Sequence, residues 1–350
     1  MEKYKLAKTF MVFKAKEFVV LNKGTNQKII SKNQWEKNKS IFNYLLNTTF
    51  FSKNELKKEM HRLSIDEDMQ DYILNGSIII DDCFDEEDLL SRSELMLNYH
   101  VGTGDYKSLL NKIESFNFFI VGCGGIGNAI SYALASIGAK NFVLFDKDII
   151  EDTNLNRQFI FSKKDAGKLK TKVLKSGLID RFDNLKIETN EDYSGTESLF
   201  LIEKIRSMNF QKTILILSAD EKEIVEEINE LTIKFKIPML NVGYFNDIST
   251  IGPFFIPWIE NSACIFCNKD NVISSDNSTL EDSINSYCNK APSWYLNNAL
   301  AVSLSIPDII KFIEGNYFAI KSTNKRVGIN NWDLSLQEVS FPRNLEHSHG

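Results

Sequence analysis

From about residue 95 onward, the chain alternates between continuous apolar runs and amphipathic segments. The apolar runs predict buried strands at 117–122 (NFFIVG), 141–146 (NFVLFD), 213–220 (TILILSAD) and 238–244 (PMLNVGY). Between them, 127–138 and 221–236 carry apolar residues at helical spacing. Apolar strands separated by amphipathic helices are typical of a parallel sheet covered on both faces. We therefore predict an α/β fold with a Rossmann-like, mostly parallel sheet over residues 96–350.

The first 95 residues follow a different pattern. Residues 10–31 predict two or three strands with a turn at 22–26, and 33–48 then has helical spacing. Ser52 is a candidate N-cap for a second helix at 53–64, with Glu55 placed for a capping box. A short strand is expected at 76–82. This order predicts a winged-helix-like α+β module that binds an extended ligand such as a peptide.

The C-terminal part is less regular. Residues from about 268 to 295 are polar and predict a long crossover loop within the α/β domain. A helix is expected at 297–315, kinked or broken at Pro307, because proline cannot donate the helical hydrogen bond.

Composition narrows the class of protein. The chain has 350 residues, 43% hydrophobic and 25% charged, with a net charge of −6. These values describe a globular protein and argue against a nucleic-acid partner held by phosphate neutralisation. No apolar run approaches the roughly 20 residues of a membrane helix, and the charged N-terminus has no secretory apolar region. Five scattered cysteines do not make a disulfide framework, so we expect a cytoplasmic protein without membrane or nucleic-acid partners.

A glycine-rich segment follows the first predicted strand of the α/β domain. Gly122, Gly124 and Gly127 fit the GxGxxG spacing, with Gly125 between them. Such a turn lets backbone N–H groups and a helix N-terminus approach a phosphate. Asp146 ends the next strand, where a carboxylate can accept hydrogen bonds from a ribose. Taken alone, this pattern favours a dinucleotide such as NAD.

The polar residues that follow favour ATP instead. The candidates for nucleotide contacts are Asp148, Asn154, Arg157, Gln158, Lys168 and Lys170. Cations beside a phosphate-binding loop suit adenylyl transfer, in which charge builds on the α-phosphate and the leaving pyrophosphate. Asp220, at the end of the 213–220 strand, is a candidate Mg²⁺ ligand. Each residue alone has a structural explanation, such as a surface ion pair or a helix cap, but the ordered set favours a triphosphate.

The combination GCGGIGN, FDKDIIEDTNLNRQ, GKLK and SAD resembles the adenylation domain of ubiquitin-activating enzymes and ThiF/MoeB proteins, over roughly residues 100–320. The resemblance implies that Asp146 holds the ribose and that Asn154 and Arg157 contact the triphosphate. It implies that Lys170 stabilises the α-phosphate and that Asp220 binds magnesium. It also implies a homodimer, because a partner subunit often completes each nucleotide site in this family.

Within the family, the chain looks most like the peptide adenylyltransferases of the microcin C type. The features that carry this likeness are the segments NVGYFNDISTIGPFFIP (241–257), NNALA and DIIKFIEG, the total length and the N-terminal module. That likeness implies a short ribosomal peptide ending in asparagine as substrate. The peptide's carboxylate would be adenylated, closed to a succinimide by the asparagine amide, and joined to AMP from a second ATP through a P–N bond. Arg157, Lys170 and Asp220 would be the catalytic residues.

Other functions stay open from the sequence. The same fold could activate a ubiquitin-like sulfur carrier, although ThiF/MoeB-type proteins lack an N-terminal module of this kind. It could also drive cyclisation of a precursor peptide, or bind nucleotide or peptide without turnover. An NAD-dependent dehydrogenase is the remaining alternative.

The cysteines raise the question of zinc. Cys264 and Cys267 form a CxxC, which in this family often joins a second CxxC near the C-terminus in a tetrahedral zinc site. Here the tail offers only His347 and His349, whose H-x-H spacing is shorter than the roughly three to five intervening residues usual in zinc sites. We therefore expect ordinary buried thiols, with a Cys₂His₂ zinc site as the alternative. Cys288, in the crossover loop, is expected to be incidental rather than a thioester-forming residue.

Overall fold

The computed structural model describes residues 2–22, 24–191, 203–204, 209–267, 292–347 and 349. The chain divides into two compact units, Met1–Lys112 and Ile113–Gly350, which are described separately below. This division falls later than the boundary at residue 95 that we expected. Most of the expected crossover loop, including Cys288, lies outside the described residues.

The N-terminal unit combines two small sheets with helices. Strands β2 (Val12–Lys14), β3 (Phe18–Leu21) and β4 (Lys28–Ser31) form an antiparallel sheet, and β1 (Tyr4–Leu6) pairs with β5 (Ile79–Asp81). The helices are α1 (Lys32–Asn47), α2 (Lys53–Arg62), α3 (Glu67–Asn75), α4 (Ser91–Val101) and α5 (Tyr106–Ser115), the last of which crosses the unit boundary. The expected capping box of Ser52 and Glu55 is present at α2. Residues from both sheets and from α1, α2 and α3 share one buried apolar core.

The second unit contains an eight-stranded sheet in the order β13-β12-β11-β10-β9-β6-β7-β8. The parallel part consists of β6 (Asn117–Val121), β7 (Asn141–Phe145), β8 (Lys186–Asn190), β9 (Thr213–Leu217) and β10 (Met239–Phe245). Three antiparallel strands extend it, namely β11 (Ile248–Phe255), β12 (Lys325–Asn330) and β13 (Leu336–Ser340). The predicted α/β fold with a mostly parallel sheet is confirmed.

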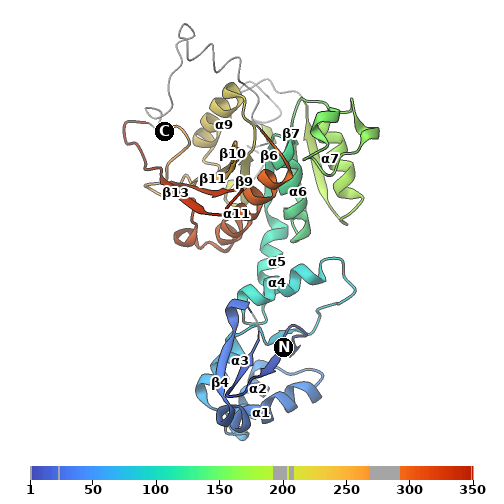
Figure 1. The fold of residues 1–350 in the computed structure, drawn as a ribbon, viewed down its shortest axis with the longest axis vertical. Helices are drawn as coiled ribbons and strands as arrows, with labels where there is room; N and C mark the ends of the chain where they lie inside the picture. Colours follow the sequence, from blue (N-terminus) through green and yellow to red (C-terminus); the bar gives the residue numbers. More distant parts are fainter. Residues whose placement is uncertain are drawn as a thin grey trace. The chain divides into compact units, whose positions relative to one another are not determined.

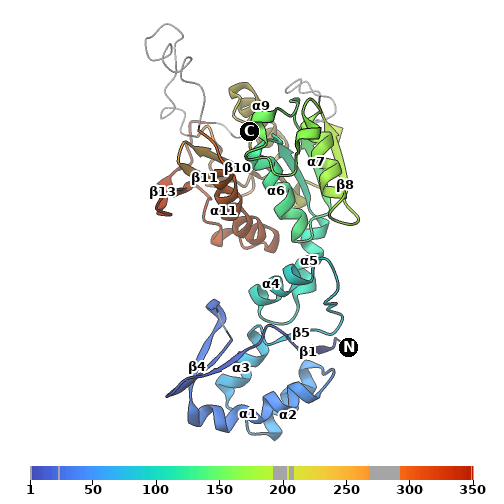
Figure 2. The ribbon, with the colours of Figure 1, turned by 45° about the vertical axis from the view of Figure 1, so that its right-hand side comes forward.

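Helices cover both faces of this sheet. On one face, α9 (Lys222–Phe235) packs through Ile224, Ile228 and Leu231 against apolar side chains of β6, β7 and β9. On the other, α6 (Gly125–Ser136) approaches Ile120, and α11 (Tyr295–Glu314) stacks Phe312 on Phe254. Helix α11 runs beside α6 (Figures 1 and 2), and α7 (Lys170–Ile179) packs against α6 and β8.

Helix α11 differs from the sequence expectation in two ways. It continues unbroken through Pro307, because its packing against the sheet offsets the hydrogen bond that proline cannot make. Among the described residues, it is also the one helix long and apolar enough to cross a membrane by length and composition. Half of its apolar window is buried inside the structure, as expected of a core helix.

Candidate nucleotide-binding site

The carboxyl ends of three neighbouring parallel strands meet at one place. Val121 of β6 lies in register with Phe145 of β7 and with Leu217 of β9. The glycine segment, Asp146 and the Ser218–Asp220 segment therefore begin side by side at one edge of the sheet. This is where α/β proteins bind ligands. A cavity of about 460 Å³ opens there.

The cavity collects most of the predicted site residues. Its lining includes Gly122, Gly124, Gly125, Asp146, Asp148, Asn154, Arg157, Gln158, Lys170 and Asp220. Gly127 and Lys168 are not among the lining residues. The structure thus brings ten of the predicted residues together at one cavity and places two outside its lining.

The glycine loop depends on close backbone packing. Gly122 has φ +91°, a left-handed conformation that favours glycine. A Cβ atom on Gly127 would lie 1.8 Å from the carbonyl oxygen of Gly122. Gly127 is therefore needed to close the strand-to-helix turn, whereas Gly124 and Gly125 face the cavity.

Asp146 joins the end of β7 to the glycine loop. Its Oδ2 accepts a hydrogen bond of 2.7 Å from the Cys123 N–H, and its Oδ1 accepts one of 2.8 Å from the Asp148 N–H. Burial raises the pKa of the Asp146 carboxyl, and the Lys170 ammonium opposes that shift. Each oxygen keeps acceptor capacity for a further donor, such as a ribose hydroxyl.

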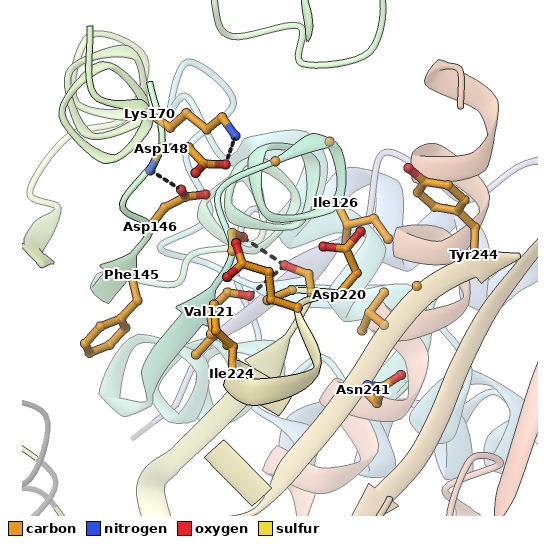
Figure 3. Close-up of a pocket in the computed structure, with 18 of the residues that line it drawn as sticks. Val121, Ile126, Phe145, Asp146, Asp148, Lys170, Asp220, Ile224, Asn241 and Tyr244 are labelled. Atoms are coloured by element: carbon orange, nitrogen blue, oxygen red, sulfur yellow. Dashed lines mark hydrogen bonds and ion pairs between the residues drawn. The ribbon is translucent and has the colours of Figure 1, made fainter. Parts of the chain in front are cut away.

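The two lysines after the glycine loop have different environments. Lys170, at the start of α7, is buried, and its Nζ lies 2.6 Å from Oδ2 of Asp148 beside the cavity. The Nζ of Lys168 instead lies 2.9 Å from Oδ1 of Asp165, and its side chain is half exposed. Of the two, Lys170 is the cation positioned to meet a bound phosphate (Figure 3).

Asn154, Arg157 and Gln158 come from the segment between β7 and α7. The Arg157 Nη1 donates to the carbonyl of Thr153 and to Oδ1 of Asn156, both at 2.9 Å. Gln158 is buried at the cavity wall, and its Oε1 has no hydrogen-bond partner among the described residues. A buried polar atom without a partner at a cavity is a candidate ligand contact.

The segment after β9 brings an exposed carboxylate to the cavity. The Ser218 hydroxyl donates to the carbonyls of Val121 and Gly122 at 3.0 and 2.8 Å, which fixes this segment to the glycine loop. Asp220 follows and lies between the glycine loop and β10 (Figure 3). No ion pair of Asp220 is found within the described ranges. A solvent-accessible carboxylate facing a phosphate cavity is the donor type that Mg²⁺ prefers, so the residue fits that ion.

A second wall of the cavity was missed from the sequence. It is formed by β10, β11 and β12 and includes Asn241, Tyr244, Phe245, Thr250 and Arg326. Figure 3 shows Asn241 and Tyr244 across the cavity from Asp146 and Lys170. The only available signal was the 241–257 segment, which carried the family likeness but no predicted site residue.

Cysteines and histidines gather at a separate place in this unit. The Cys267 Sγ lies 3.9 Å from the Cys264 Sγ and 3.4 Å from Nε2 of His349. One ligand atom each from Cys264, His347 and His349 lie within 4.8 Å of one another. Tetrahedral zinc has bonds of about 2.3 Å to sulfur and about 2.0 Å to nitrogen. Two sulfur ligands of such an ion are therefore separated by about 3.8 Å, and a sulfur and a nitrogen ligand by about 3.5 Å.

The chemistry of these donors also suits zinc. His347 Nε2 is buried and has no hydrogen-bond partner in the part of the chain that the structure describes. The hydrogen bond from the Cys264 thiol and the nearby Arg343 guanidinium lower the pKa of Cys267, which favours the thiolate that binds metal, whereas the same hydrogen bond and burial raise the pKa of Cys264. Cys264, His347 and His349 therefore fit the Cys₂His₂ alternative that the sequence left open, with Cys267, beside Cys264 and His349, as the fourth candidate donor.

Comparison with known proteins identifies the family. The ThiF family model matches residues 97–348. The crystal structure of E. coli MccB with AMPCPP and MccA is 25% identical in sequence, with a TM-score of 0.78 and 99% coverage of both chains. PaaA is 18% identical, with a TM-score of 0.64 over 96% of this chain and 100% of PaaA, and so shares the fold.

The curated relatives are ubiquitin-like activating enzymes. SUMO-activating enzyme subunit 2 of Dictyostelium discoideum is 29% identical over 150 residues, which are 41% of this chain and 22% of that protein. The NEDD8-activating enzyme E1 catalytic subunit of the same organism is 28% identical over 168 residues, 47% of this chain and 35% of that protein. The matches thus span well under half of these relatives' length.

These findings agree with the motifs in the cavity. The family match and the MccB structures support an ATP-dependent adenylyltransferase. The resemblance of the glycine loop and its downstream residues to the ThiF/MoeB and ubiquitin-activating adenylation domains is confirmed. The chain belongs to the ThiF family.

Proposed function

We propose that this protein uses ATP to adenylate the carboxyl end of a short, ribosomally made peptide. The observation that carries the proposal is the single cavity in which the glycine loop, Lys170, Arg157 and Asp220 meet. Likeness to E. coli MccB adds support because it extends over 99% of this chain and so includes the N-terminal unit. MccB structures with ATP and with MccA show that protein with a nucleotide and a peptide.

The first step needs no protein nucleophile. An oxygen of the peptide carboxylate attacks the α-phosphorus of ATP, and the bond to the bridging oxygen of pyrophosphate breaks. Lys170 and Arg157 stabilise the charge that grows on the phosphates, and the N–H groups of the glycine loop hold them in place. Asp146 orients the ribose. Asp220 holds Mg²⁺, which neutralises phosphate charge when bound.

The peptide ends in asparagine in the finer version of this proposal. The asparagine amide nitrogen attacks the activated carboxyl, AMP leaves, and a succinimide forms. The succinimide nitrogen then attacks a second ATP and releases pyrophosphate, and hydrolysis of the ring leaves a peptide joined to AMP through a P–N bond. E. coli MccB has been solved with a succinimide, which supports this order of steps.

The N-terminal unit serves as the peptide-recognition module in this proposal. We expect the protein to act in the cytoplasm as a homodimer. A mass-spectrometric assay with ATP, Mg²⁺ and asparagine-ending peptides, MccA included, tests the proposed function. The expected product is the peptide with one added adenylyl group, formed with two pyrophosphates released. No peptide-dependent pyrophosphate release with any peptide would overturn the proposal.

Activation of a ubiquitin-like carrier is the second candidate, favoured by the curated relatives. Carrier activation would consume one ATP and leave an acyl-adenylate on a terminal glycine. Release of pyrophosphate with a Gly-Gly-ending carrier, and none with asparagine-ending peptides, would reverse our order.

A structural zinc ion completes the proposal. Cys264, Cys267, His347 and His349 would hold it, with the two histidines in the place of a second CxxC. Zinc in such a closed site supplies folding free energy and takes no part in the chemistry.

A further inference from the structure

Arg326 is a half-buried cation on the second wall of the cavity. It lies on β12 and lines the cavity. Its guanidinium carbon lies 5.6 Å from the ring centre of Phe245 and 5.4 Å from that of Phe341. Burial lowers the pKa of Arg326, yet arginine stays charged in proteins.

The charge of Arg326 lacks a protein counter-ion. Its Nε is buried and has no hydrogen-bond partner, and no acidic residue pairs with it in the part of the chain that the structure describes. Withdrawing part of a charge from water without an ion-pair partner is unfavourable. Two aromatic rings compensate only part of that cost. The arrangement therefore calls for an anion supplied by a ligand.

The neighbouring strands leave room for such a ligand. In the sheet register, Gly243 pairs with Thr250, and Thr250 pairs with Gly328. Arg326 is two residues from Gly328, so both face the same side of the sheet. Gly243, Thr250 and Arg326 all line the cavity, and a Cβ on Gly243 would meet no atom nearer than 4.0 Å, so this wall has free space at Gly243.

Phosphate binding is already provided for elsewhere in the cavity. The glycine loop, Lys170 and Arg157 belong to the β6–β7 side, whereas Arg326 belongs to the β10–β12 side. A carboxylate is the anion that the proposed reaction brings in addition to ATP. Its two oxygens match the guanidinium fork, which can donate to both.

We propose that Arg326 binds the C-terminal carboxylate of the peptide substrate and holds it opposite the α-phosphate of ATP. This inference rests on the proposed function. Adenylation converts the carboxylate into a mixed anhydride with AMP, in which the carboxyl group no longer carries a charge, so the contact is strongest before the reaction. Arg326 should consequently affect the binding of the peptide more than that of ATP.

Peptide binding separates this inference from the proposed function. MccA peptide and its C-terminal amide are titrated against the full-length protein with AMPCPP present, and ATP affinity is measured in parallel. We expect wild-type protein to prefer the acid at least about tenfold, as a charge-assisted hydrogen bond of about 1.5–3 kcal/mol would give. Arg326→Gln should bind acid and amide equally, with ATP affinity within about twofold of wild type.

Two further variants serve as controls. Arg326→Lys keeps the charge but loses the fork and should show intermediate preference. Arg181→Gln removes an arginine outside the cavity that bonds the Gly177 carbonyl, and it should behave as wild type. Weakened ATP binding in Arg326→Gln with the acid preference retained would make Arg326 a phosphate ligand and overturn the inference. Equal binding of the acid and the amide by the wild-type protein would also overturn the inference, even if that protein adenylates the peptide. Acid preference without pyrophosphate release would instead refute the proposed function alone.

Discussion

The ammonium of Lys170 lies 2.6 Å from the carboxylate of Asp148, at the edge of the cavity. The lysine is only 8% exposed, so its charge is largely held away from water beside this one carboxylate. Lys168, two residues earlier in the chain, has its own carboxylate partner in Asp165. The two lysines are therefore a matched pair that differs in access to the cavity.

Lys170→Ala should lower the rate of peptide adenylation at least about 100-fold, because a preorganised donor to the transition state contributes about 3 kcal/mol. Lys168→Ala should stay within about threefold of wild type, since an exposed ion pair contributes little. Pyrophosphate release at saturating ATP and peptide measures both rates. Equal losses in the two variants would show that Lys170 has no special role.

The glycine loop yields a prediction that separates folding from binding. Gly127→Ala places a methyl group 1.8 Å from the Gly122 carbonyl oxygen, so the loop must shift. We expect a loss of about 1–3 kcal/mol in stability, which thermal unfolding would detect. At Gly124 the nearest atom to a new Cβ is 3.8 Å away, so Gly124→Ala should keep wild-type stability.

Gly124 faces the cavity, however, and its substitution should weaken ATP binding, because a methyl group would displace a phosphate from the backbone N–H groups. Calorimetric titration with ATP checks this. Unchanged ATP affinity in Gly124→Ala would mean that the phosphates lie elsewhere.

The strand ends account for what the sequence could predict. Gly122, Asp146 and Asp220 each follow an apolar run, and parallel strands bring such ends together, so their meeting was predictable. Arg326 was not predictable in this way. It lies on an antiparallel strand that joins β11 after a long crossover, and no local pattern specifies that pairing. The approach of His349 to Cys267 was not predictable either, because H-x-H spacing says nothing of where the tail passes the CxxC.

Asp146 gives a prediction about pH. Its folded pKa lies above the unfolded value of 3.8, so the stability linked to its protonated form is present below 3.8 and is lost as pH rises through the raised pKa. Ribose binding has the opposite preference, because the ionised carboxylate is the better acceptor. At neutral pH, Asp146→Asn should bind ATP about tenfold more weakly, as the loss of a hydrogen bond to a charged group predicts.

That difference should shrink as pH falls toward the raised pKa, because protonated Asp146 then resembles asparagine. Fluorescence titrations with an ATP analogue over a pH series would compare the two proteins. A ratio of dissociation constants that stays constant over the whole series would contradict the role of Asp146 at the ribose.

The zinc site is tested most directly by metal analysis of the purified protein. We expect about one zinc per chain, because ligand atoms of Cys264, His347 and His349 lie within 4.8 Å of one another and the Cys267 Sγ lies beside Cys264 and His349. His349→Ala should lose zinc and lower the unfolding temperature, since metal binding contributes to folding free energy.

Cys83→Ser, which changes an exposed cysteine outside this cluster, is the control and should retain both the zinc content and the unfolding temperature. The cysteines and histidines of the cluster do not line the cavity. Protein that lacks part of its zinc should therefore lose thermal stability before it loses ATP binding measured without peptide. Protein that contains no zinc after growth with added metal, and whose stability does not change in His349→Ala, would instead support the ordinary buried thiols that the spacing suggested.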